Sequence, residues 1–86
     1  MDIRVLRYFL MVAQEESFSR AAERLFLSQP TLSRQIHELE TELGVTLLKR
    51  SNRYVILTSD GQRLRKRAQE IVELADKKRQ EFAVTT

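Results

Sequence analysis

The segment from residue 28 to residue 44 carries the side chains whose types and spacing best fit a defined chemistry. Ser28 precedes a proline in the first predicted turn and Gly44 follows the last apolar position, so both ends of a helix are predicted. Its apolar arc holds Leu32, Ile36, Leu39 and Leu43, and the opposite face holds Pro30, Ser33, Arg34, His37 and Thr41. Hydroxyl, guanidinium and imidazole groups on one face suit hydrogen bonding to nucleic-acid base edges, although a solvated helix face would explain them equally well.

Positive charge is concentrated close to this segment. The chain has 86 residues and a net charge of +3, yet residues 46–67 hold seven basic side chains and one acidic one. The seven are Lys49, Arg50, Arg53, Arg63, Arg65, Lys66 and Arg67. A polyanion is the natural partner for such a block, while on charge alone a solvated face is the commoner explanation.

Length and composition exclude several classes of protein. The length allows one small domain. With no cysteine and a single histidine, we expect neither a thiol nucleophile nor a zinc module, and no other cofactor is expected. The apolar run from Tyr8 to Ala13 is too short for a signal peptide or a membrane span, so a cytoplasmic protein is expected. Ser33, His37 and Glu40 resemble a catalytic set, but they share one helix in a chain too small to enclose a pocket, so no enzyme is expected.

Two amphipathic helices are predicted before residue 28. The first, over residues 3–16, has its apolar stripe at Ile3, Leu6, Phe9, Leu10 and Ala13. The second begins at a Ser17 or Ser19 cap, and its stripe consists of Phe18, Ala21, Ala22 and Leu25. Together with the helix after Ser28, these would form a small three-helix body.

A hairpin and a long helix are predicted after residue 44. Two short strand-like runs flank the polar loop 49–53, which is compatible with a small wing. Thr58 or Ser59 can cap the next helix, with Gln62 in a capping-box position, and nothing breaks this helix before about Ala83.

The long helix carries apolar residues at alternating steps of four and three, the period of a coiled coil. They are Leu64, Ala68, Ile71, Ala75 and Phe82. We expect this seam to pair with a second copy of the chain, giving a homodimer. The alternative is a seam that folds back on its own domain, which could cover Leu64 and Ala68 but not easily Phe82.

The predicted fold class is therefore mainly α: a winged helix-turn-helix of three helices and a two-stranded wing, followed by a long dimerisation helix. The corresponding division is a DNA-binding domain over residues 1–58 and a linker helix with the chain end over residues 59–86. The alternative function is a helical interaction module whose long tail binds proteins and whose basic block serves RNA binding or solubility.

The chain resembles the DNA-binding domain of LysR-type transcriptional regulators. The resemblance rests on the runs 17–25 (SFSRAAERL) and 28–36 (SQPTLSRQI) and on scattered positions that include Gly44, Leu57, Thr58 and Gly61. It implies a bacterial, cytoplasmic regulator that binds an interrupted inverted repeat of double-stranded DNA as a dimer. A small-molecule effector would act only through a C-terminal domain that this sequence lacks.

The resemblance also implies roles for individual residues. Gln29, Pro30, Ser33 and Arg34 would face bases in the major groove, and Arg53 would enter the minor groove. These side chains suit the roles, since Arg34 can bind guanine bidentately, Gln29 suits adenine, and Pro30 can touch a thymine methyl. His37 is either a further specificity or phosphate contact or an uninvolved surface residue. The expected DNA backbone contacts are Ser17, Ser19, Arg20, Thr31 and Arg50.

Overall fold

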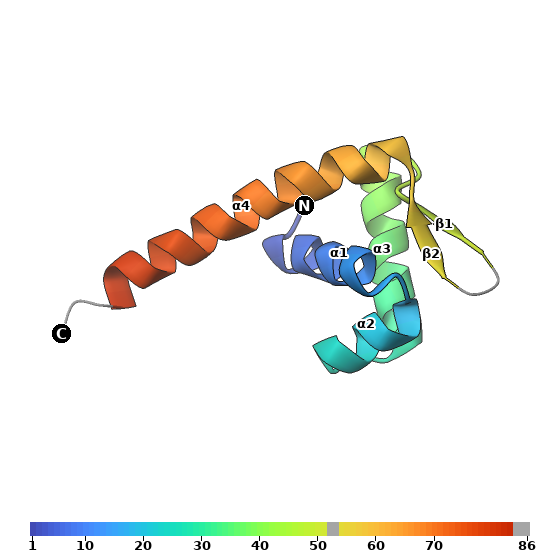
Figure 1. The fold of residues 1–86 in the computed structure, drawn as a ribbon, viewed down its shortest axis with the longest axis horizontal. Coiled ribbons are helices and arrows are strands. Elements are labelled where there is room, and N and C mark those ends of the chain that lie inside the picture. The colour runs from blue at the N-terminus through green and yellow to red at the C-terminus, as the bar shows by residue number, and fades with distance from the viewer. Residues whose placement is uncertain (52–53, 84–86) are drawn as a thin grey trace.

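The computed structural model describes residues 1–51 and 54–83. Figure 1 shows a small helical body, a two-stranded wing on one side and a long terminal helix that runs across the body and beyond it. The elements are α1 (Ile3–Glu15), α2 (Phe18–Leu25), α3 (Gln29–Leu43), β1 (Leu48–Arg50), β2 (Val55–Leu57) and α4 (Ser59–Ala83). The predicted fold class, mainly α with a winged helix-turn-helix and a long last helix, is confirmed.

Local capping chemistry sets the ends of the helices. Ser17 caps α2 by accepting a hydrogen bond from the backbone N–H of Arg20 at 3.2 Å, so of the two predicted candidates it is Ser17, and not Ser19, that does so. Ser28 caps α3 in the same way, and Gly44 ends that helix in the left-handed conformation with φ +71°. Phe26 ends α2 with φ +57°, a conformation that costs a residue with a side chain more than it costs glycine.

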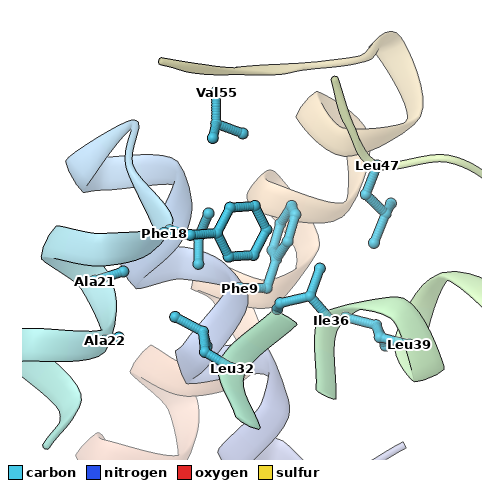
Figure 2. Packing of buried hydrophobic residues seen from close by; sticks show 10 residues of the cluster. Phe9, Phe18, Ala21, Ala22, Leu32, Ile36, Leu39, Leu47 and Val55 are labelled. Atoms are coloured by element: carbon cyan, nitrogen blue, oxygen red, sulfur yellow. The ribbon is translucent and has the colours of Figure 1, made fainter. Parts of the chain in front are cut away.

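A single apolar core joins the three helices to the wing. Figure 2 shows the rings of Phe9 and Phe18 at its centre, with Leu47 and Val55 closing it from the side of the hairpin. The predicted stripe of α1 was partly wrong. Val12, which the prediction omitted, is fully buried.

The error in α1 has a geometric cause. Ile3 is 38% exposed, and Leu10 and Ala13 are half-buried. The fully packed arc follows Leu6, Phe9 and Val12, because α1 is covered on several sides by α2, α3 and α4 rather than on one face only. At the end of α3, Leu43 is likewise exposed although its periodicity predicted burial.

The wing is a two-stranded antiparallel sheet that is attached to the body. Leu48 pairs with Leu57 and Arg50 pairs with Val55. Next to the pair of Arg50 and Val55, the backbone N–H of Ser51 donates to the carbonyl of Tyr54 at 2.9 Å. The N–H of Val55 donates to the carbonyl of Glu16 at 3.0 Å, so β2 is fixed to the turn between α1 and α2.

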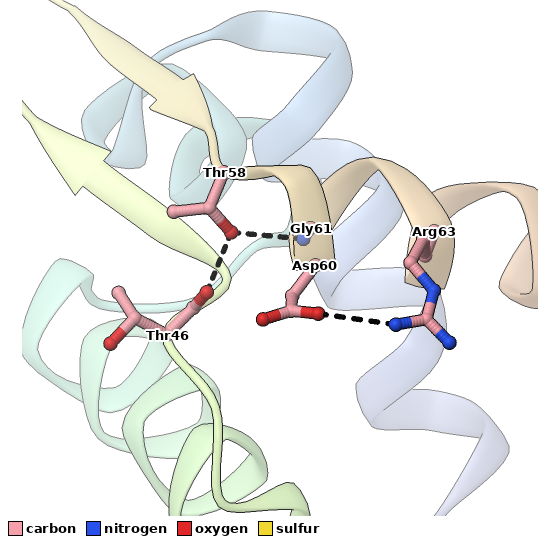
Figure 3. A network of polar contacts seen from close by, with 5 residues as sticks. All are labelled: Thr46, Thr58, Asp60, Gly61 and Arg63. Carbon is pink, nitrogen blue, oxygen red and sulfur yellow. Dashed lines mark hydrogen bonds and ion pairs between the residues drawn. The ribbon is translucent and has the colours of Figure 1, made fainter.

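The start of α4 is tied to the segment before β1. Thr58 accepts a hydrogen bond from the N–H of Gly61 at 3.0 Å and donates to the carbonyl of Thr46 at 2.6 Å, as Figure 3 shows. Thr58 is therefore the cap, and the predicted capping box of Ser59 with Gln62 is wrong, because the third helical position falls on Gly61.

The first half of α4 packs on the body, and this corrects part of the predicted dimer seam. Ala68 is 0% exposed within a single chain, and Leu64 packs against the core cluster. These two residues are covered by α1 and its neighbours. This is what the alternative interpretation predicted, in which the seam folds back on its own domain. Ile71 is 45% exposed and Phe82 72% exposed, so the outer part of the seam lies at the surface.

Among the residues that the structure describes, no helix has both the length and the apolar content needed to span a membrane.

Candidate nucleic-acid interface

The N-terminal turns of α2 and α3 lie side by side and are joined by their side chains. The hydroxyl of Ser19 donates to the Oε1 atom of Gln29 at 3.1 Å. Both residues are exposed, so this contact lies on the surface. Two helix N-termini with their free N–H groups and positive dipole ends thus lie close together.

Arg50 connects the wing to both of these helices. Its guanidinium donates to the hydroxyl of Ser33 on α3 at 2.9 Å and lies 4.0 Å above the ring of Phe18 at the start of α2. A cation held over an aromatic face keeps its charge while losing much of its freedom. The strand β1, the outer face of α3 and the first turn of α2 therefore present one continuous polar surface.

This surface contains a shallow hollow of about 220 Å³. The hollow is lined by Ser17, Phe18, Ser19, Gln29, Arg50, Ser51, Tyr54 and Val55. Hydroxyl, amide and guanidinium groups line it without any carboxylate among the described residues, which suits a phosphate oxygen.

The remaining predicted contacts on α3 are exposed, except for Thr31, which is half-buried. Arg34 and His37 both lie on the outer face, and neither side chain has a hydrogen bond or ion pair to another described residue. Pro30 is exposed in the first turn, and Thr31 there receives a hydrogen bond from the hydroxyl of Ser28 at 2.8 Å. Arg20 on α2 is exposed as well.

One predicted contact cannot be placed. Arg53, expected in the minor groove, lies outside the described residues together with Asn52.

The resemblance of Ser33, His37 and Glu40 to a catalytic set finds a different explanation. An oxygen of Glu40 accepts hydrogen bonds from the backbone N–H groups of Leu47, at 2.7 Å, and Leu48, at 3.3 Å. Glu40 thus fixes the start of β1 to α3, and Ser33 receives the hydrogen bond of Arg50. In the described part of the chain, no group of acidic or histidine side chains could hold a metal ion.

The basic block of residues 46–67 is not one patch in space, which corrects the sequence interpretation. Lys49 and Arg50 are on the wing. Arg63, Lys66 and Arg67 line a different hollow with Leu43, at the C-terminal end of α3. Figure 1 shows the reason: α4 starts beside the end of α3 that is remote from α2.

Sequence reasoning missed the role of Phe18 in this surface. Its place in an apolar stripe predicted burial, and the side chain is indeed only 6% exposed. The contact of its ring with Arg50 forms only when the wing packs against α2. Because the two residues are 32 positions apart in the sequence, no local pattern reveals this contact.

Comparisons with known proteins agree with this geometry. The family described as "bacterial regulatory helix-turn-helix protein, lysR family" matches residues 3–62. The transcriptional regulator AlsR of Bacillus subtilis is 55% identical over 62 residues, which are 72% of this chain and 20% of AlsR. YcgK of the same organism, an uncharacterised regulator, is 46% identical over 76 residues, or 88% of this chain and 24% of YcgK. The chain thus spans about a quarter or less of these relatives.

Solved structures with DNA have the same fold. The BenM DNA-binding domain in complex with catB site 1 DNA matches with a TM-score of 0.92 and 41% identity over 96% of this chain and 92% of that chain. Full-length CbnR complexed with its target DNA matches with a TM-score of 0.89 and 41% identity over 96% of this chain and 29% of that chain. The resemblance seen in the sequence is confirmed: the chain belongs to the lysR family of bacterial regulatory helix-turn-helix proteins.

Proposed function

We propose that this chain binds double-stranded DNA sequence-specifically as a dimer and so regulates transcription in bacteria, without catalysing a reaction. The observation that carries the proposal is the continuous surface in which Gln29 is held by Ser19 and Ser33 by Arg50. In the solved DNA complexes of BenM and CbnR, the same fold is bound to DNA.

The outer face of α3 supplies the base contacts in this proposal. Arg34 is exposed and has a guanidinium that matches the two acceptors of guanine, and Pro30 can contact a thymine methyl. Ser19 holds the amide oxygen of Gln29, which leaves the amide nitrogen to donate to a base. Ser33 and His37 lie along the same face.

The surroundings of α3 supply the contacts to the DNA backbone. Phosphates would bind Ser17, Ser19, Arg20, Thr31 and Arg50, which lie at or near the N-terminal turns of α2 and α3 and on the wing. Arg53 would enter the adjacent minor groove, where a narrow groove holds the more negative potential.

The outer half of α4 supplies the dimer contact. Ile71, Leu74 and Ala75 line an open apolar groove with Ile3, and Leu74, which the sequence interpretation did not include, is 69% exposed. Together with Phe82 these residues form a seam that a second copy can cover, and the two recognition helices would then meet an interrupted inverted repeat. We place the protein in the bacterial cytoplasm, at the nucleoid when it is bound.

The test compares two arginine variants on DNA sites selected from random duplexes. Arg34→Ala removes a base contact, so we expect a loss of about 1 to 3 kcal/mol on the selected site and much less on random DNA. Arg63→Ala removes the same charge at the opposite end of α3 and serves as the matched control, with an unchanged preference for the selected site.

Two outcomes would contradict the proposal in different ways. Equal losses of Arg34→Ala on both DNAs would make this residue a phosphate contact. A wild-type chain whose binding to duplex DNA does not weaken between low and moderate salt would refute DNA binding itself, because bound cations must release counterions.

A further inference from the structure

The long helix α4 is fastened to the body at distinct points along its length. Near its start, Gly61 is buried against the segment that leads into β1, and about two turns further on Ala68 is fully buried. Beyond Ala68, no described residue of α4 is fully buried.

One ion pair continues the attachment beyond Ala68. Arg7 on α1 donates to Asp76 on α4, with 2.7 Å from Nη2 to Oδ1 and 3.4 Å from Nη1 to Oδ2. The other ion pairs described on α4, Arg63 with Asp60 and Arg67 with Glu70, join residues only three positions apart and stay within the helix. Among these described ion pairs, the Arg7–Asp76 pair is therefore the one that connects α4 to another element.

We infer that the Arg7–Asp76 pair fixes the direction of α4 relative to the winged-helix body and thereby sets the spacing of DNA half-sites that a dimer accepts. The inference rests on the proposed function, because it needs a dimer that pairs through the outer part of α4. Arg7 and Asp76 are positioning residues in it and touch no DNA.

The two partners are well suited to hold a direction. Two hydrogen bonds from one guanidinium to one carboxylate define an orientation as well as a distance. The hydrogen bond from Arg7 lowers the pKa of Asp76 below its ordinary value, and the charges of Arg7 and Arg79 act in the same sense, so the carboxylate is ionised at neutral pH. Since both side chains are partly exposed, the pair adds little to folding stability.

The length of the helix turns a small change of direction into a large displacement. From Ala68 to Phe82 the axis extends about 21 Å, so a tilt of about 10° at Ala68 would move the far end by about 4 Å. One turn of B-DNA contains 10 to 10.5 base pairs and spans about 34 to 36 Å, which corresponds to a rise of about 3.4 Å per base pair. A tilt of this size therefore changes the matching half-site separation by about one base pair.

The experiment measures affinity for a series of inverted repeats whose half-sites are moved apart or together in single base-pair steps. We expect the wild-type chain to prefer one separation and Asp76→Asn to lose much of that preference, with a several-fold smaller ratio between the best site and its neighbours. Affinity for an isolated half-site should stay unchanged. Glu70→Gln removes an ion pair of the same helix that does not reach α1, so it is the matched control and should keep the wild-type spacing profile.

A charge exchange separates this role from a general loss of structure. The double variant Arg7→Glu with Asp76→Arg restores an ion pair between α1 and α4 and should regain the preference. If Asp76→Asn had the same spacing profile as the wild type, the inference would be overturned. A loss of half-site binding in Asp76→Asn would also overturn it, because that result would show a role in folding. A wild-type chain that binds no half-site would refute the proposed function instead.

Discussion

Gly61→Ala is the substitution for which the structure predicts the largest effect from the smallest change. Gly61 lies in the first turn of α4, where the helix passes the chain that enters β1. A Cβ atom at this position would overlap the carbonyl oxygen of Leu47 and stand 3.0 Å from Cδ2 of Leu57. The first obstacle is backbone, which cannot turn aside as a side chain can.

The cost follows from what must move. Alanine is the better helix former and would by itself stabilise the helix by about 1 kcal/mol. To admit the methyl group the turn must separate from Leu47, which strains the hydrogen bonds from Thr58 N–H to Leu47 at 3.0 Å and from Gly61 N–H to Thr58 at 3.0 Å. Losing one or two such bonds costs about 1 kcal/mol each, and overpacking costs about 1 to 3 kcal/mol more. These contributions span a net destabilisation of about 1 to 4 kcal/mol, and we expect a value near the middle, about 2 to 3 kcal/mol.

Urea denaturation followed by circular dichroism measures this difference, and thermal unfolding should show a midpoint lower by about 10 to 20 °C for a domain of this size. Gln62→Ala is the matched control, since Gln62 is the next residue of the same helix and is exposed, and it should change stability by less than about 0.5 kcal/mol. Gly44→Ala should cost about 1 kcal/mol from its φ of +71° alone, because nothing lies within 4 Å of the added Cβ. A Gly61→Ala variant as stable as the wild type would refute the reasoning.

Three further substitutions test other parts of the structure. Phe26→Gly should stabilise the chain by about 0.5 to 1 kcal/mol in urea denaturation, because the residue has φ +57° and a side chain that is 95% exposed. Phe26→Ala keeps the Cβ atom, so an equal gain in that variant would contradict the explanation. Arg50→Lys keeps the charge but loses the planar contact with Phe18, so specific DNA affinity should fall about 3- to 10-fold in a binding titration, and an unchanged affinity would show that charge alone matters. Glu40→Ala leaves the buried N–H of Leu47 without its partner and should cost about 1 to 3 kcal/mol, whereas unaltered unfolding would show that this hydrogen bond is dispensable.

Helix ends were the most predictable part of the fold, because their chemistry is contained in a few neighbouring residues. Ser28 with the following proline and Gly44 marked both ends of α3 correctly. The choice between Thr58 and Ser59 at the start of α4 was not decidable locally. Thr58 is also fixed by its hydrogen bond to Thr46, which lies 12 positions earlier and comes close only when the wing has formed.

Burial was less predictable where one helix contacts several elements. Periodicity assumes that a helix has a single buried face, and this holds for the middle of α3, where Leu32, Ile36 and Leu39 are buried. It fails for α1, where Val12 is fully buried although a single-stripe reading leaves it out. A sequence pattern gives the direction in which each side chain points around the helix axis. It does not give the number of other helices and strands that pack around that helix.

The surface position of the candidate site residues was predictable from the sequence, but their arrangement in space was not. Gln29, Ser33 and Arg34 were selected from one helix, and the structure places all of them on the surface. Their connection through Arg50 joins segments that are 17 and 32 positions apart, so it depends on the tertiary fold. The same fold separates Lys49 and Arg50 of the wing from Arg63, Lys66 and Arg67 of α4, which the linear count had combined.

The role of α4 changes within the helix rather than at its first residue. A division at residue 58 follows the order of elements, yet Leu64 and Ala68 belong to the packing of the body, and exposure of the apolar residues begins at Ile71, which is 45% exposed. The helix is continuous over 25 residues, so the direction of its outer part depends on the packing of Gly61 and Ala68 as well as on the Arg7–Asp76 pair. A substitution at Gly61 or Ala68 can therefore alter the geometry of a dimer without touching the seam. For this reason stability and DNA spacing must be measured together in every variant of α4.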